Sequence, residues 1–340
     1  MSRLANVAEL RLFFALSVLV SHTIQLAGFS DYDIWRQILS SEVAVQGFFI
    51  LSGFLVLGSY TKHPSERDFY LRRLLRIYPG YVVAVLVFLA LCLTEAASHA
   101  QLPSAAQVQR YLVANLLLLN FLQPGLDGVF SGNAYREING ALWTIKLEVM
   151  FYALVPLLHR VAHRWSFRAL GVGLIVCGLL WRPALGLVEA ALGHPLHQAL
   201  FHQLPGQLHF FGLGVLLFDM SRQPAQARGN LLVLLGAAAS ALVLGDQRLA
   251  LQMLLLSAFV YAITCLPQWR TPFERHDLSY GVYLCHFPII QLLIAFGLAN
   301  QGILVFLSAT LLLASLYALA SWRWIEAPAL RLPTHRHRTQ

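Results

Sequence analysis

Charge is what this sequence has least of. Only 12% of its 340 residues are Asp, Glu, Lys or Arg, whereas 58% are hydrophobic and the mean hydropathy is +0.63. Soluble domains carry roughly 25% charged residues. The shortage of charge excludes an ordinary soluble globular protein and predicts an integral membrane protein.

Cysteines are also few, and no two of them lie close together in the sequence. The four lie singly inside apolar runs, at Cys92, Cys177, Cys265 and Cys285. This spacing matches neither a disulfide framework nor a cysteine zinc site, so we expect packing residues. A small-residue cleavage pattern after the first apolar run is lacking too, and we expect that run to be a retained helix rather than a signal peptide.

The sequence contains many long apolar runs. Ten of them have lengths near the roughly 20 residues that a spanning helix needs, at 8–28, 42–60, 78–97, 142–162, 168–182, 206–220, 230–245, 249–266, 279–299 and 302–325. The sequence therefore predicts an all-α integral membrane protein, a polytopic bundle of about ten transmembrane helices. An eleventh run, 107–121, is shorter and polar at both ends, and we interpret it as one re-entrant or interfacial helix.

The distribution of basic residues predicts the orientation. With ten spans and the N-terminus in the cytoplasm, most Arg and Lys residues fall in cytoplasmic loops, as the positive-inside rule requires. Counting 107–121 as a span would place the basic loops HRVAHRWSFR and RTPFER outside. We therefore expect both termini in the cytoplasm. The net charge of +8 follows from this rule and does not predict nucleic-acid binding.

The first apolar run contains two ionisable residues, Arg11 and His22, with ten residues between them. Such groups are costly at membrane depth and are usually functional. Eleven steps of about 100° and about 1.5 Å place both on one face of a helix, roughly 16 Å apart along it. This spacing favours a protein that binds a ligand near one membrane surface and moves protons nearer the other.

A second motif is the basic segment RDFYLRRLLRIYPGY, with Arg72, Arg73 and Arg76. Arg73 and Arg76 are three residues apart and share a helix face. The planar guanidinium suits bidentate contact with phosphates, which favours an anionic ligand. An ordinary positive-inside cluster beside anionic lipid headgroups is the alternative.

A third motif, ALWTIKLEVMFYALVP, places Glu148 about two helical turns from the outer end of its span, at a depth that matches His22. A carboxylate beside an imidazole orients the ring and raises its basicity, as a general base requires. The alternative is a structural ion pair of Glu148 with Lys146 or Arg11. Lys146 is only two residues away and faces another side of the helix.

Other polar residues are weaker candidates. Tyr280, Tyr283 and His286, in DLSYGVYLCHFPII, are candidate lining residues of a ligand channel together with Trp143, although a core histidine is an equally good interpretation. Arg323 and Glu326 predict a salt bridge at the end of the last span. The small residues of FFILSGFLVLGSY predict close helix packing. A histidine-rich stretch, with His194, His197, His202 and His209, lacks a compact ligand pattern, so we expect no metal site.

Six segments together resemble one known family. They are Arg11 with His22, GFFILSGFL, RRLLRIYP, LWTIKLEVMFY, LSYGVYLCHFP and WRWIEAP, in order over nearly the whole chain. This series resembles the acyltransferase family 3 membrane proteins. The resemblance implies a single transmembrane domain over residues 1–340 in a bacterial cytoplasmic (inner) membrane. The soluble SGNH hydrolase-like domain of longer members is not expected, which leaves open a separate periplasmic partner.

The resemblance also implies an activity. It implies O-acylation, usually O-acetylation, of a surface or lipid-linked polysaccharide such as the lipopolysaccharide O-antigen. Acetyl-CoA is then the cytoplasmic donor substrate, and no permanently bound cofactor is expected. Arg11, Arg73 and Arg76, with Arg72 beside them, would contact the acyl-CoA. His22, oriented by Glu148, would either deprotonate the sugar hydroxyl or accept the acetyl group first.

Two other function classes stay open. A polyprenyl-phosphate-dependent glycosyltransferase would carry an acidic pair in its first outer loop, and Asp31 with Asp33 is a faint match. A transporter or flippase of lipid-linked sugar would use intramembrane charges without an acyl donor. Binding of acetyl-CoA separates the three classes.

Overall fold

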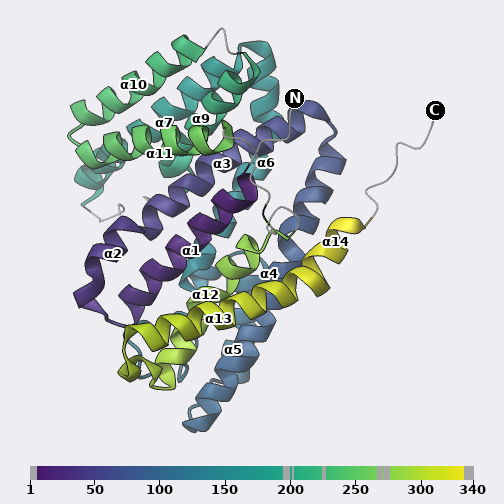
Figure 1. Cartoon of the computed structure of the whole chain (residues 1–340), viewed down its shortest axis with the longest axis vertical. Helices are drawn as coiled ribbons and strands as arrows, with labels where there is room; N and C mark the ends of the chain where they lie inside the picture. The colour runs from purple at the N-terminus through teal and green to yellow at the C-terminus, as the bar shows by residue number, and fades with distance from the viewer. Residues whose placement is uncertain are drawn as a thin grey trace. The chain divides into compact units, whose positions relative to one another are not determined.

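The computed structural model describes residues 6–193, 200, 203–223, 227–265, 271 and 276–332. Within these ranges the regular elements are helices, apart from one isolated bridge between Gly125 and Glu137 (Figure 1). The predicted all-α class is therefore confirmed.

Ten of the longer helices coincide with the ten apolar runs of the sequence. The α-helices are α1 (Val7–Leu26), α2 (Asp33–Ile38), α3 (Ser41–Lys62), α4 (Glu66–Ser98), α5 (Ala105–Leu116), α6 (Trp143–Arg164), α7 (Phe167–Leu192), α9 (Leu204–Arg222), α10 (Ala227–Val243), α11 (Gln247–Cys265), α12 (Ser279–Ala295), α13 (Ile303–Ser321) and α14 (Ala327–Arg331). One π-helical turn, η7 (Trp322–Glu326), joins α13 to α14.

Seven helical segments of the described chain are long and apolar enough to cross a membrane. They are Val7–Leu26, Ser30–Lys62, Glu66–Ser98, Gly140–Arg164, Phe167–Leu192, Gln247–Thr264 and Ile303–Arg331. The three other predicted runs form α9, α10 and α12, of 19, 17 and 17 residues. The protein is thus a multi-pass membrane protein, and the count of ten crossings stays a prediction.

The segment 107–121 forms a helix too short to cross. Helix α5 has 12 residues, which is about 18 Å of rise against a hydrocarbon core of about 30 Å. It begins at a capping box in which Ser104 accepts from the backbone of Gln107 and Gln107 accepts from the backbone of Ser104. Its length fits the predicted re-entrant or interfacial helix.

The chain divides into two compact units. Unit 1 comprises Met1–Val7, Val45–Phe69 and Leu147–Trp269, and unit 2 comprises Ala8–Ala44, Tyr70–Lys146 and Arg270–Gln340. A single transmembrane domain over 1–340 stays a prediction.

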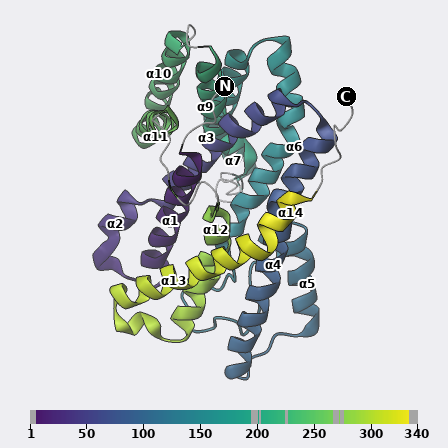
Figure 2. The same ribbon diagram turned by 45° about the vertical axis from the view of Figure 1, so that its right-hand side comes forward.

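In unit 1, α7, α9, α10 and α11 form one packed group (Figures 1 and 2). Small residues allow the close approach, because a Cβ atom on Gly178 of α7 would lie 2.4 Å from the backbone nitrogen of His209 in α9. One on Gly53 of α3 would lie 2.1 Å from the carbonyl oxygen of Phe211 in α9. The predicted packing role of the small residues near Gly53 is confirmed.

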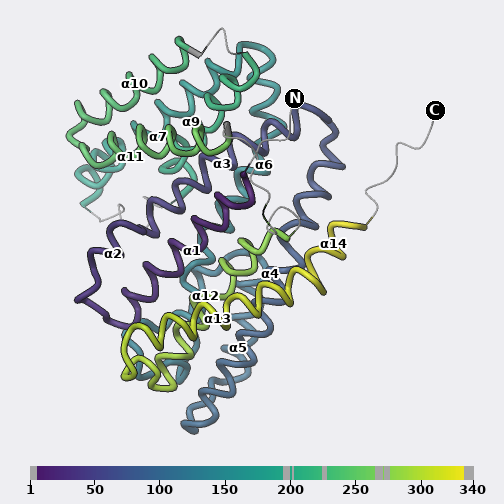
Figure 3. Tube along the Cα trace, viewed as in Figure 1, coloured from purple at the N-terminus to yellow at the C-terminus, as the bar shows by residue number. Residues whose placement is uncertain are grey.

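Unit 2 contains α1, α5, α12, α13 and the greater part of α4. Helix α12 packs along α13, where Gly281 lies against Ala318. The traces of α1 and α12 lie side by side although they are far apart in sequence (Figure 3). Two pairs of polar side chains connect these two helices, and they form the candidate site.

Candidate active site

Helices α1 and α12 are joined by polar pairs at two levels. Arg11 of α1 binds Asp277, which lies just before α12, and His22 of α1 binds His286 of α12. The pairs occur in the same order along both segments, so the two helices run in the same direction. Eleven residues of α1 separate the levels by roughly 16 Å.

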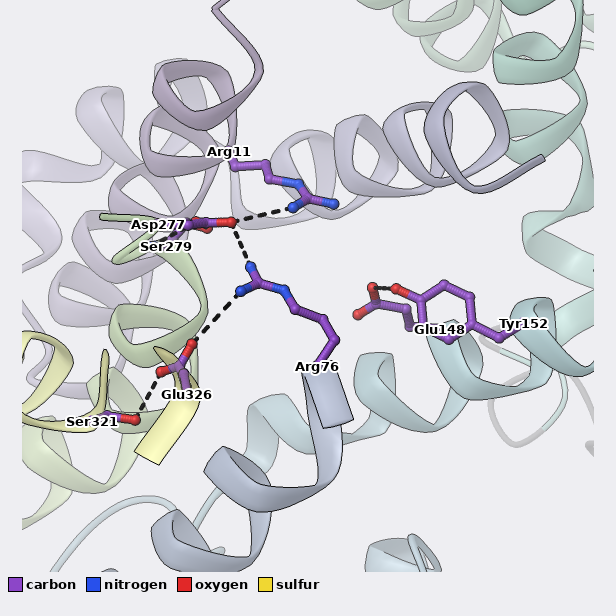
Figure 4. A network of polar contacts seen from close by, with 8 residues as sticks. All are labelled: Arg11, Arg76, Glu148, Tyr152, Asp277, Ser279, Ser321 and Glu326. Carbon is purple, nitrogen blue, oxygen red and sulfur yellow. Dashed lines mark hydrogen bonds and ion pairs between the residues drawn. The ribbon is translucent and has the colours of Figure 1, made fainter. Parts of the chain in front are cut away.

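The first level is a charged network centred on Asp277 (Figure 4). Its Oδ2 accepts from Arg11 Nη1 at 3.2 Å and from Arg76 Nη2. The second nitrogen of Arg76, Nη1, lies 3.8 Å from Oε2 of Glu326. The Arg76 guanidinium also lies over the Tyr280 ring, 5.8 Å from its centroid. Two of the predicted donor-binding arginines, Arg11 and Arg76, are therefore brought together.

The π-helical turn η7 explains how Glu326 reaches this network. A π turn is wider than an α turn and pairs residues five apart. Ser321 and Glu326 have this spacing, and the Ser321 hydroxyl donates to Glu326 Oε1 at 2.7 Å. The sequence predicts a salt bridge between Glu326 and Arg323, whereas the recorded ionic partner of Glu326 is Arg76. The regular i, i+3 geometry behind that prediction does not apply inside a π turn.

Asp277 is held ionised by its neighbours. Burial raises the pKa of its carboxyl group, but the Arg76 and Arg11 guanidinium groups and the hydrogen bonds from Ser279 outweigh burial. The net result lowers the pKa of Asp277 from 3.8 to about 2. Its position directly before α12 also suits a negative charge, because a helix N-terminus carries positive partial charge.

The second level is a pair of histidines, His22 and His286. Nδ1 of His22 lies 2.9 Å from Nε2 of His286, and the two rings stack with centroids 5.1 Å apart. Nδ1 of His286 lies 2.7 Å from the carbonyl oxygen of Tyr283. The Phe287 ring packs edge-on against the ring of His22, with centroids 5.7 Å apart. His286 is fully buried, whereas His22 is partly exposed.

Helix α12 is fixed by the segment that precedes α6 and by the first turn of α6. Pro288 has no backbone N–H and leaves the carbonyl of Leu284 without its helical donor. The Asn139 side chain donates to that carbonyl at 2.8 Å. The Thr144 hydroxyl lies 2.7 Å from the hydroxyl of Tyr283. These contacts hold the part of α12 that carries His286.

Other predicted residues lie as follows. The Glu148 carboxylate, in unit 1, accepts from the Tyr152 hydroxyl (Figure 4). Its pairing with His22, in unit 2, stays a prediction, and the ring partner that the structure gives to His22 is His286. The ammonium group of Lys146 lies over the ring of Phe121, 4.6 Å from its centroid.

The remaining candidates are half-buried or buried. Arg72, Arg73 and Trp143 are half-buried. Tyr280 is buried and donates its hydroxyl to the carbonyl of Ile77 at 2.8 Å. Channel lining by the tyrosines and Trp143 stays a prediction.

The histidine-rich stretch is described only in part. His194, His197 and His202 lie outside the described residues, while His209 is buried in α9. Within the residues that the structure describes, no three His, Cys, Asp or Glu side chains are grouped as metal ligands.

Sequence reasoning missed Asp277 and the link between His22 and His286. A signal for Asp277 was available, since it is an acid directly before an apolar run at the end where the arginines were predicted. The histidine pair had no such signal, because the sequence does not show which helices face each other.

Comparisons with known proteins place this chain in a family. Residues 9–322 match the acyltransferase domain of family 3. The chain belongs to this acyltransferase family. Nodulation protein 10 of Rhizobium leguminosarum bv. viciae is 30% identical, over 97% of this chain and 94% of that protein. An O-acetyl transferase of Shigella phage Sf6 is 27% identical, over 84% of each chain.

A third relative is an acyltransferase of Streptomyces mycarofaciens, 28% identical over 58% of this chain and 52% of that protein. No solved structure matches. The chain is therefore an enzyme that transfers acyl groups, and these relatives support an O-acetyltransferase.

Proposed function

We propose that this acyltransferase moves an acetyl group from cytoplasmic acetyl-CoA to a hydroxyl of a surface or lipid-linked polysaccharide, such as an O-antigen. The observation that carries the proposal is the pair of levels on one side of α1, with arginines at one and His22 at the other. The name of the phage relative, an O-acetyl transferase, supports acetyl transfer to oxygen.

The donor would be held at its phosphates. Arg73 and Arg76, with Arg72 beside them, would bind the phosphates, and the pantetheine arm would extend past Arg11 toward His22. An extended donor needs two contact points that are far apart, and Arg11 and His22 are roughly 16 Å apart along α1. Arg11 and Arg76 both form ion pairs with Asp277. The negative charge of Asp277 reduces the repulsion between the two guanidinium groups, so they can lie close together before a phosphate binds.

His22 would act as the base. The acceptor hydroxyl loses its proton to His22 while its oxygen attacks the thioester carbon. The carbon–sulfur bond then breaks, and the departing thiolate of CoA takes the proton back from the imidazolium. The products are the acetyl ester and free CoA, and His22 returns to its neutral form. A separate periplasmic partner that passes the acetyl group on stays a prediction.

The test uses membranes that contain the protein together with their own acceptor. Radiolabelled acetyl-CoA is added, and label that mild base releases from the saccharide fraction is counted, because O-acetyl esters are labile to base. His22→Ala should abolish the labelling at equal membrane abundance, whereas His99→Ala, in an exposed position, should leave it unchanged. Labelling of the His22 variant at the wild-type rate would overturn the role of His22.

Transfer in the wild type without any need for acetyl-CoA would overturn the proposed donor instead. Binding of acetyl-CoA, measured on the purified protein, therefore accompanies the transfer assay. A glycosyltransferase or a flippase would show neither binding nor labelling.

A further inference from the structure

We infer that His286 is a positioning residue for acyl transfer: it accepts the Nδ1 proton of His22, so that Nε2 of His22 carries the free electron pair. This inference rests on the proposed function, in which His22 is the base. The sequence alone suggested only channel lining or core packing for His286.

The carbonyl of Tyr283 determines which ring nitrogen donates and which accepts in each hydrogen bond of the histidine pair. A carbonyl oxygen can only accept, so the 2.7 Å contact with Tyr283 O requires a proton on Nδ1 of His286. In a neutral imidazole the other nitrogen is then an acceptor. Nε2 of His286 therefore accepts, and Nδ1 of His22, 2.9 Å away, must donate.

A neutral His286 fits its surroundings. The side chain is fully buried, and among the described residues its ring contacts His22, Tyr283 and Phe287 rather than a carboxylate. An isolated charge in such a place would be costly. The pair thus holds one proton between two nitrogens, and that proton belongs to His22.

The consequence for His22 concerns its second nitrogen. With the proton held on Nδ1, Nε2 of His22 has its electron pair available for a hydroxyl proton or for an acyl group. A neutral imidazole in water prefers the opposite arrangement, with the proton on Nε2. His286 thereby has the role that a carboxylate has in a catalytic triad, where loss of the orienting group leaves the wrong tautomer.

The surrounding contacts make His286 rigid enough for this role. The carbonyl of Tyr283 binds His286, the Tyr283 hydroxyl contacts Thr144, and Asn139 binds the carbonyl of the next residue, Leu284. A Cβ atom on Gly140 would lie 2.8 Å from the Phe287 ring, so the backbone at Gly140 limits where Phe287 and hence His22 can lie. Both rings of the histidine pair are thereby held in place.

The kinetic test compares two substitutions of His286. His286→Leu removes the acceptor and should lower kcat on the order of 100-fold while the KM for acetyl-CoA is unchanged. His286→Gln keeps an acceptor oxygen near the place of Nε2 and should stay within about tenfold of wild type. His99→Gln is the matched control. If kcat falls equally in the Leu and Gln variants at normal abundance, His286 contributes only packing, and the inference is overturned.

A spectroscopic readout tests the proton directly. Nitrogen NMR of histidine-labelled protein in lipid distinguishes a protonated from an unprotonated ring nitrogen, and the His22→Ala spectrum identifies the His22 signals. Wild type should show the proton on Nδ1 of His22, and His286→Leu should move it toward Nε2. A proton on Nε2 in the wild type would overturn the inference.

Failure of the inference and of the proposed function give different results. If transfer needs His22 but proceeds at the wild-type rate in His286→Leu, the inference fails and the proposed function stands. If the wild type transfers no acetyl group from acetyl-CoA, the proposed function fails, and the role of His286 in catalysis fails with it.

Discussion

At the residue scale, one carboxylate holds two arginines of the candidate site together. Arg11 and Arg76 would repel each other, but Asp277 lies between them and accepts from both. The sequence singles out these arginines as candidate site residues, because basic groups inside or beside apolar runs are conspicuous. It could not predict Asp277 as their common partner, because 201 residues separate Asp277 from Arg76 and 266 separate it from Arg11.

Removal of the shared carboxylate should destabilise this network. Asp277→Asn leaves two guanidinium groups facing each other and should cost about 2 kcal/mol, the scale of a charged hydrogen bond. Thermal unfolding in detergent measures the loss. Arg36 and Asp33 form an exposed ion pair, and Asp33→Asn, the control, should change the unfolding temperature little.

The pH dependence of this contribution follows from the lowered pKa of Asp277. A depressed pKa means that the contribution is complete above the unfolded value of 3.8 and is lost as the pH falls through about 2. Glu326 also contacts Arg76, so the comparison is made in a Glu326→Gln background. There the stability difference between proteins with and without Asp277→Asn should be constant from about pH 5 to about pH 8. A difference that changes steadily over that interval would contradict the assigned ion pairs.

Bidentate contact is the property that separates arginine from lysine at the donor site. Arg73→Lys and Arg76→Lys should each weaken acetyl-CoA binding about tenfold despite the conserved charge. Arg67→Lys, an exposed position in the same basic segment, is the control. If both test variants bind acetyl-CoA as tightly as wild type, these arginines do not bind the donor. They are then an ordinary positive-inside cluster.

At the element scale, the sequence predicted the helices well, because each apolar run has the length of a helix. It did not predict the π turn η7, which a local pattern does not specify. Nor could it show which faces meet, since α1 and α12 lie at opposite ends of the chain. The pairing of His22 with His286, and its predicted pairing with Glu148, both depend on that missing information.

Close helix packing in unit 1 gives a prediction at this scale. Gly53→Ala would place a methyl group 2.1 Å from the Phe211 carbonyl oxygen, and the helices must separate. We expect a loss of about 1–3 kcal/mol, typical of overpacking. Gly173→Ala is the matched control, since a Cβ atom there meets nothing within 4 Å. Equal unfolding temperatures of the two variants would contradict the close contact of α3 with α9.

At the scale of the whole molecule, orientation in the membrane connects the site to its substrates. If 107–121 does not span, a reporter fused after Gln340 should be cytoplasmic. A cysteine at Gly132, an exposed position, should react with a reagent that does not cross the membrane. The length of α5 supports this arrangement. A reporter outside and an unreactive cysteine at Gly132 would instead make 107–121 a span.

Such a result would affect the two predicted roles differently. Glu148 would then approach from the cytoplasmic side, at the wrong depth for His22. The roles of Arg73 and Arg76 would survive, because these residues precede the disputed segment. Their contacts with acetyl-CoA are therefore tested independently of the topology.

The central claim, that His22 is the base in acetyl transfer to a surface glycan, is tested most directly by the acetyl content of that glycan. Ester-linked acetate is measured on surface polysaccharide from cells with the wild-type protein, with His22→Ala at equal membrane abundance, and without the protein. We predict acetate in the first cells and its loss in both others. Equal acetate in the wild-type and His22→Ala cells would contradict the claim.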